Sequence, residues 1–213
     1  MRITLTIIII FSSYFSFSQE IPKVVYEISL LSRPQKVILK EYQNEKFVGL
    51  IITEITKGTG NPNFLQRLWK DLWKLENEEL VLQSKIDNTI VKELVLKLKK
   101  EGIETIEDCL NDEDCSKTGF LDGGSVTFKV KTDKIDRLVG FEEIYPLTEN
   151  NKENNKEKNQ LRFKAQKLLT ILYNDIDLNK EFSDLFKELP KGKYHWYQAS
   201  GHGIVTINNR SIK

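Results

Sequence analysis

Near the N-terminus, three short runs rich in β-branched and aromatic residues are separated by two polar breaks. The runs cover 24–31, 36–42 and 47–55, and the breaks cover 32–35 and 43–46. Each run has the length of a β-strand, and connections this short favour antiparallel neighbours. The pattern therefore predicts a three-stranded antiparallel meander.

Apolar residues recur every three or four positions in four further segments, which is the spacing of one face of an α-helix. The predicted helices cover 61–73, 84–102, 161–173 and 179–189. Ser84 opens a capping-box sequence, so we expect it to cap the second of these helices.

A strict alternation of apolar and polar residues follows at 126–131, where every second residue is apolar. A second strand is predicted over 135–144, so these two segments form a hairpin. A last hairpin is predicted from 193–199 and 204–208, around a Gly-rich turn at 200–203.

The order of these elements lacks the regular strand–helix alternation of a parallel sheet. It predicts the α+β class: an antiparallel sheet, made of the N-terminal meander plus later hairpins, with amphipathic helices packed on one side. Residues 148–160 contain no apolar residue and are expected to form a polar loop or linker. Residues 19–213 are expected to form a single domain.

Residues 1–18 have the layout of a secretory signal peptide. Arg2 precedes an apolar stretch at 7–11, and small serines precede the expected cleavage site before Gln19. The apolar run is shorter than the roughly 20 residues that a spanning helix needs. We therefore expect an exported protein, periplasmic or extracellular, with no membrane span after signal cleavage.

The charge of the chain is nearly balanced, with 32 Lys and Arg against 31 Asp and Glu. Removal of the signal peptide takes away Arg2 and no acidic residue, so the mature chain has a formal charge of zero. A neutral chain without a basic stripe argues against a nucleic-acid partner. Any electrostatic recognition is expected to be local.

Cys109 and Cys115 are the only cysteines in the chain. An even number of closely spaced cysteines in an exported protein predicts a disulfide. A Cys₂His₂ zinc site with His195 and His202 is the alternative, but neither spacing fits a zinc finger. We expect no bound metal and no cofactor, and the chain carries no Gly-rich phosphate or dinucleotide motif.

The cysteine segment is strongly acidic. Its acidic side chains are candidates for binding a basic target, and carboxylates are also the ligands that calcium prefers. The segment fails the EF-hand pattern, because Lys117 stands where that loop requires glycine. A solvated acidic loop is the plainest interpretation. The candidate residues are Asp108, Asp112, Glu113 and Asp114.

Both histidines lie in the C-terminal segment 194–203. His202 near Ser200, with His195 nearby, is the weak candidate for a hydrolase site, although residues two apart in a Gly-rich turn do not by themselves form a nucleophile and its base. On a strand, His195 and Tyr197 point to one face and their neighbours to the other. Tyr197 is therefore a candidate binding residue.

Two segments, from Cys109 through G-F-L-D-G-G into S-V-T-F-K-V-K-T and at Leu189-Pro190-Lys191-Gly192, resemble small exported bacterial proteins of no assigned activity. The resemblance implies no catalytic residue. The leading hypothesis is an exported, non-catalytic binding module whose partner is an unknown protein or ligand of the cell envelope or exterior. The alternatives are a hydrolase near Ser200 and His202, and a calcium-dependent module at the acidic cysteine loop.

Overall fold

The computed structural model describes most of the chain. The described residues are 20–30, 33–58, 78–116, 125–147, 156–198 and 201–207. The expected signal peptide, the helix expected over 61–73 and most of the polar segment 148–160 lie outside them.

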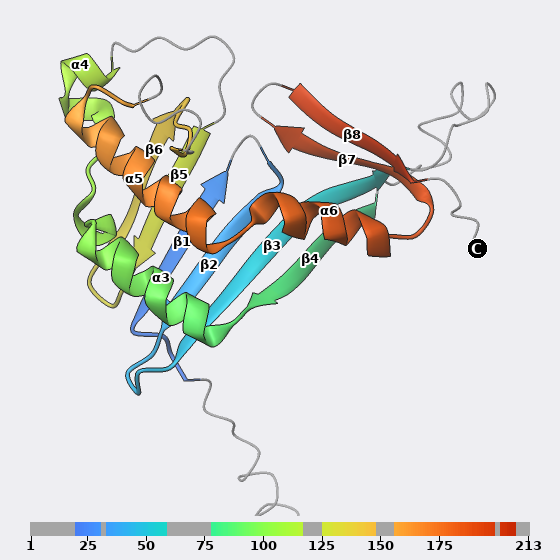
Figure 1. The fold of residues 1–213 in the computed structure, drawn as a ribbon, viewed down its shortest axis with the longest axis horizontal. Coiled ribbons are helices and arrows are strands. Elements are labelled where there is room, and N and C mark those ends of the chain that lie inside the picture. Colours follow the sequence, from blue (N-terminus) through green and yellow to red (C-terminus); the bar gives the residue numbers. More distant parts are fainter. Residues whose placement is uncertain are drawn as a thin grey trace, which may run out of the picture.

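The described residues form one eight-stranded antiparallel sheet with helices on one face, as an α+β fold requires (Figure 1). The spatial order is β6-β5-β1-β2-β3-β7-β8, and β4 pairs with β3. The strands are β1 (Val24–Leu30), β2 (Gln35–Glu41), β3 (Phe47–Gly58), β4 (Glu78–Ile86), β5 (Ser125–Lys131), β6 (Asp136–Glu142), β7 (Gly192–Gln198) and β8 (Gly201–Ile207).

The predicted meander is confirmed as β1, β2 and β3. Buried and half-buried residues alternate along β1 and β2 and along β3 as far as Thr53, because every second side chain faces the helices. β3 is twelve residues long and extends beyond β2, because β2 pairs only with residues 47–53 of β3. Beyond that point 56–58 pair with β7, so the sheet forks where β2 ends and the C-terminal hairpin begins.

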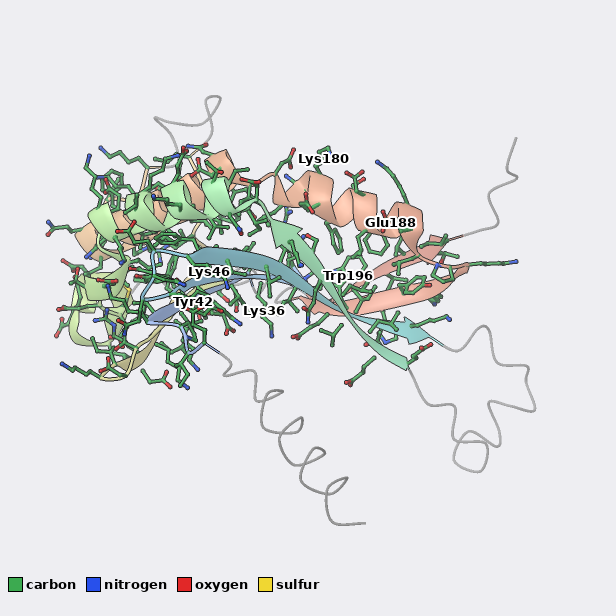
Figure 2. The ribbon with its side chains drawn as sticks, turned by 90° about the horizontal axis from the view of Figure 1, so that it is seen from below. Lys36, Tyr42, Lys46, Lys180, Glu188 and Trp196 are labelled. Carbon is green, nitrogen blue, oxygen red and sulfur yellow. A yellow bond between two sulfur atoms is a disulfide. The ribbon has the colours of Figure 1, made fainter. Side chains whose placement is uncertain are left out.

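Three helices cover one face of the sheet: α3 (Asn88–Lys100), α5 (Gln160–Asp175) and α6 (Leu178–Glu188). They form a single layer in the orthogonal view (Figure 2). The core lies between α3, α5 and strands β1, β2, β5 and β6. Its largest fully buried side chains include Tyr26, Ile28, Leu39, Leu94, Leu98, Phe128, Phe141, Leu168 and Leu172.

Two sequence predictions are wrong, and one strand was missed. Ser84 lies within β4, and Asp87 is the N-cap of α3, accepting hydrogen bonds from Thr89 N and Ile90 N. The strand β4 itself was not predicted, because most of its side chains are exposed and its apolar pattern is weak. In the last hairpin Gln198 pairs with Gly201, so His202 lies in β8 rather than in the turn.

The remaining elements are short and precede β5. They are the 3₁₀ turns η1 (Ile103–Thr105) and η2 (Cys109–Asn111) and the single-turn helix α4 (Glu113–Ser116). Across the residues that the structure places, no helix has both the length and the apolar character to cross a membrane.

Candidate functional site

A groove of about 390 Å³ lies along the edge strand β6, between this strand and the disulfide loop. Five consecutive residues of β6, 138–142, form one wall. The side chains of consecutive strand residues point to opposite faces of the sheet. A wall that includes all five consecutive residues is therefore formed by the backbone at the edge of the strand. Asp108, Cys109, Leu110, Cys115 and Arg162 complete the lining.

The outer backbone groups of β6 follow from the register of its hairpin with β5. Thr132 N donates to Ile135 O at 2.7 Å, and hydrogen-bonded pairs alternate with non-hydrogen-bonded pairs along an antiparallel ladder. Leu138, Gly140 and Glu142 occupy non-hydrogen-bonded positions opposite β5. Their N–H and C=O groups therefore point away from β5 and into the groove.

Arg162 confirms this direction at one end of the groove. Its Nη1 donates to the carbonyl oxygen of Glu142 at 3.0 Å, which requires that carbonyl to face outward. Arg162 is 3% exposed and also binds the Glu157 carboxylate through Nε (2.8 Å) and Nη2 (2.9 Å). The guanidinium thus anchors the end of β6 to the segment before α5.

Within the part of the chain that the structure describes, the outward N–H and C=O groups of Leu138 and Gly140 have no hydrogen-bond partner. Among the described strands, β5 is the one that pairs with β6, and its opposite edge faces the groove. Leu138 is 61% exposed and Leu110, across the groove, is 84% exposed. The groove therefore combines outward-facing main-chain donors and acceptors with apolar surface, as a site for an added strand requires.

The opposite wall is held by the predicted disulfide, which the structure shows between Cys109 and Cys115. Their Cα atoms lie 5.1 Å apart, and Cys115 is buried against the core. Asp108 caps η2 by accepting a hydrogen bond from Leu110 N at 3.0 Å. The loop is therefore a fixed wall.

Asp112 links this loop to α5. Its carboxylate accepts hydrogen bonds from Cys115 N at 2.9 Å and from Asn159 Nδ2 at 3.1 Å, and these bonds hold the pKa of Asp112 below its ordinary value. Asn159 in turn caps α5 through Leu161 N. Part of the segment expected to be a free polar loop is therefore tied to the cysteine loop.

The wall of the groove is acidic. Residues 103–116 contain six acidic residues and no basic residue. Glu113 and Asp114 are exposed there, and Asp108 and Glu142 line the groove itself. Among the described lining residues Arg162 is the one cation, and it is engaged by Glu157 and by main-chain oxygens. The groove therefore offers a negative surface to a bound segment.

The carboxylates of the loop do not assemble into a metal site. In the described part of the chain, no three His, Cys, Asp or Glu side chains gather in a way that could hold an ion. Asp108 and Asp112 instead serve as caps of backbone N–H groups. The structure therefore gives the calcium hypothesis no support.

The histidine candidates lie at the other end of the molecule, in the β7–β8 hairpin. His195 pairs with Thr56 of β3 and Ile204 of β8, on the face that the helices leave open. Among the described residues, no carboxylate hydrogen-bonds or ion-pairs with His195. His202 is opposite Tyr197 in the register, while Ser200 lies outside the described residues, as do the side chains of His202 and Tyr197.

Another hollow, of about 420 Å³, lies at the fork of the sheet, and Arg33 and Trp196 are among its walls. Two of its charged side chains form an ion pair, in which Lys36 Nζ lies 2.5 Å from a Glu54 carboxylate oxygen. The groove at β6 differs because outward-facing main-chain groups of an edge strand line it. We therefore take the β6 groove as the candidate site.

Sequence reasoning identified the disulfide loop but missed the strand that faces it. Gly140 is the residue from which this strand edge could have been identified, because a glycine inside an alternating strand often marks a close approach of another backbone. Neither a scan against models of protein families nor a search of curated proteins gives a match for this chain.

Proposed function

We propose that this protein is an exported, non-catalytic binding module that captures an extended, basic polypeptide segment. The segment adds a strand to β6 and lies in the groove between β6 and the disulfide loop. One observation carries the proposal: the outward N–H and C=O groups of an edge strand face a fixed acidic wall.

The main chain of the groove supplies affinity without dependence on sequence. Leu138 and Gly140 each offer one N–H and one C=O to a strand laid alongside, while Arg162 already occupies the carbonyl of Glu142. Gly140 has no side chain, which lets a second backbone approach closely. A strand of about five residues matches the wall formed by 138–142.

The acidic wall selects the charge of the segment. Six acidic residues without a basic one between 103 and 116 attract lysine or arginine side chains and repel acidic ones. Such partly exposed charges mainly raise the association rate and are screened by salt. Binding is therefore expected to weaken as salt is added.

The disulfide fits the proposed location outside the reducing cytoplasm, where such bonds persist. It also keeps the groove wall in place while a partner binds. Residues 1–18 fit the same location as a signal peptide.

The proposal is tested with two labelled peptides of alternating design, Lys-Val-Lys-Val-Lys and Glu-Val-Glu-Val-Glu, by fluorescence anisotropy. We expect the basic peptide to bind at least tenfold more tightly at low salt. Leu138→Pro removes one outward N–H at a position where an edge strand tolerates proline. Leu138→Thr is the matched control, because it shortens the side chain but keeps the N–H.

Loss of binding in Leu138→Pro with binding retained in Leu138→Thr supports strand addition. Equal affinity for the two peptides, or equal binding by the two variants, contradicts it. Circular dichroism of both variants verifies that the sheet is intact.

A further inference from the structure

A second cavity, of about 160 Å³, lies between α6 and the helix-covered face of the sheet. Its floor is made of two cross-strand rows, Gln35–Thr53–Leu82 and Ile51–Ser84, from β2, β3 and β4. Its roof is one face of α6. This cavity is separate from the β6 groove and shares no lining residue with it.

Gln35 is the unusual residue of the floor. It is 2% exposed and occupies a position equivalent to Val37 and Leu39 on the buried face of β2. Neither Oε1 nor Nε2 of Gln35 has a hydrogen-bond partner among the described residues. An unpaired buried amide destabilises a fold, and an apolar residue of the same size removes that penalty. The amide therefore points to a ligand.

The roof of the cavity is acidic. Glu181, Asp184 and Glu188 follow one another at helical spacing on the same face of α6. Asp184 is already engaged by Lys180 and Lys187, and these bonds lower its pKa to about 2.

Two carboxylates of the roof remain for a ligand. Glu181 accepts a hydrogen bond from Ser84 Oγ at 3.1 Å, and within the described residues neither Glu181 nor Glu188 has a salt bridge. Figure 2 labels Glu188 near the end of this helix. Leu178 is the one fully buried residue of this helix.

We propose that this cavity binds a small amino alcohol. The side-chain amide of Gln35 has a donor and an acceptor, which match the hydroxyl of such a molecule. The carboxylates of Glu181 and Glu188 match its ammonium group, since a charge-assisted hydrogen bond is stronger than a neutral one. The volume admits a molecule of a few heavy atoms, with its hydroxyl at the floor and its ammonium at the roof.

Ethanolamine is the probe, with ethylammonium and ethylene glycol as matched controls that lack the hydroxyl and the ammonium respectively. The readout is ¹H–¹⁵N NMR of the full mature protein, with the Gln35 side-chain NH₂ as reporter. We expect saturable shifts of this group and of the Ser84 and Glu181 amides with ethanolamine, and at least tenfold weaker binding of each control. Non-saturating shifts, or equal binding of ethylene glycol, overturn the proposal.

Two variants connect the binding to the named residues. Gln35→Met is expected to raise the thermal midpoint and to abolish ethanolamine binding. Glu188→Gln is expected to weaken binding at least tenfold, whereas Glu93→Gln, an exposed position on α3, leaves it unchanged. Unchanged affinity in Gln35→Met, or equal affinity in the two glutamate variants, contradicts the proposal. Because Glu188 is exposed, its variant decides the question even if Gln35→Met does not fold.

Discussion

The indole ring of Trp196 lies across Gly203, its cross-strand neighbour in the β7–β8 hairpin. A Cβ atom on Gly203 would fall inside the van der Waals radius of the ring. On its other side, the indole packs against Phe182 at 5.2 Å and Phe186 at 5.8 Å between ring centroids. This pairing attaches α6 to the C-terminal hairpin and so positions the roof of the Gln35 cavity (Figure 2).

The first prediction concerns this contact. Gly203→Ala forces Trp196 to move, and overpacking of this kind costs about 1–3 kcal/mol of stability. Guanidinium denaturation measures the loss, and a shift in tryptophan fluorescence reports the displaced ring. Gly140→Ala is the matched control, because there a Cβ meets only Thr127 Cγ2 at 3.6 Å. Equal effects of the two substitutions contradict the contact.

The second prediction concerns the disulfide loop. Replacing Cys109 and Cys115 together by serine removes a cross-link that closes a short loop, which costs about 2 kcal/mol in the loop-closure model. We expect the sheet to persist and peptide binding at the β6 groove to weaken, because one wall loses its constraint. Denaturation and anisotropy on the same sample measure both effects. Full binding by the double variant would show that the wall needs no disulfide.

The third prediction concerns Arg162 at the end of the groove. Arg162→Lys keeps the positive charge. The lysine ammonium cannot replace the planar guanidinium, which hydrogen-bonds the Glu157 carboxylate and the Glu142 carbonyl at the same time. We expect a loss of about 3 kcal/mol, the scale for breaking a buried ion pair. Lys164→Arg, two residues along α5, is the control, because it makes the reverse exchange of lysine for arginine. A loss below about 1 kcal/mol in Arg162→Lys is inconsistent with an anchoring role.

The fourth prediction is a pH dependence at Glu41, on the buried face of β2. Burial alone raises the pKa of Glu41, but the hydrogen bond and charge of Lys99, aided by Lys23, hold it below its ordinary value of 4.5. A lowered pKa in the folded state contributes stability above pH 4.5, and this contribution is lost as the pH falls through the folded pKa.

The wild-type protein is therefore expected to lose more stability than Glu41→Gln between pH 7 and pH 3. Urea denaturation at several pH values measures the difference. Parallel curves for the two proteins would show that the ion pair with α3 does not contribute.

Much of the fold is predictable from local patterns. Buried and half-buried residues alternate along β1, β2 and most of β3 because one face of each strand is buried. The helix α5 begins near its predicted start because Asn159 caps it. β4 is not predictable in this way, because neither of its faces is buried over most of its length. Its side chains are mostly exposed, so hydrogen bonds with β3 rather than an apolar pattern place it in the sheet.

The candidate site is less predictable, because it depends on strand order. The hairpin of β5 and β6 is recognisable from 126–131, but only its pairing with β1 makes β6 an edge strand. Leu138 and the cysteine loop line the same groove although they are far apart in the sequence. Tertiary packing decides such contacts, and local sequence does not encode them.

Amide hydrogen exchange at β6, measured by NMR with and without the basic peptide, tests the central claim most directly. The account predicts that Leu138 and Gly140 exchange quickly in the free protein, whereas Val139 and Phe141, which bond to β5, exchange slowly. Adding Lys-Val-Lys-Val-Lys is expected to slow Leu138 and Gly140 and to leave the other two unchanged. Slow exchange at all four residues in the free protein, or no protection on adding the peptide, would contradict strand addition at this groove.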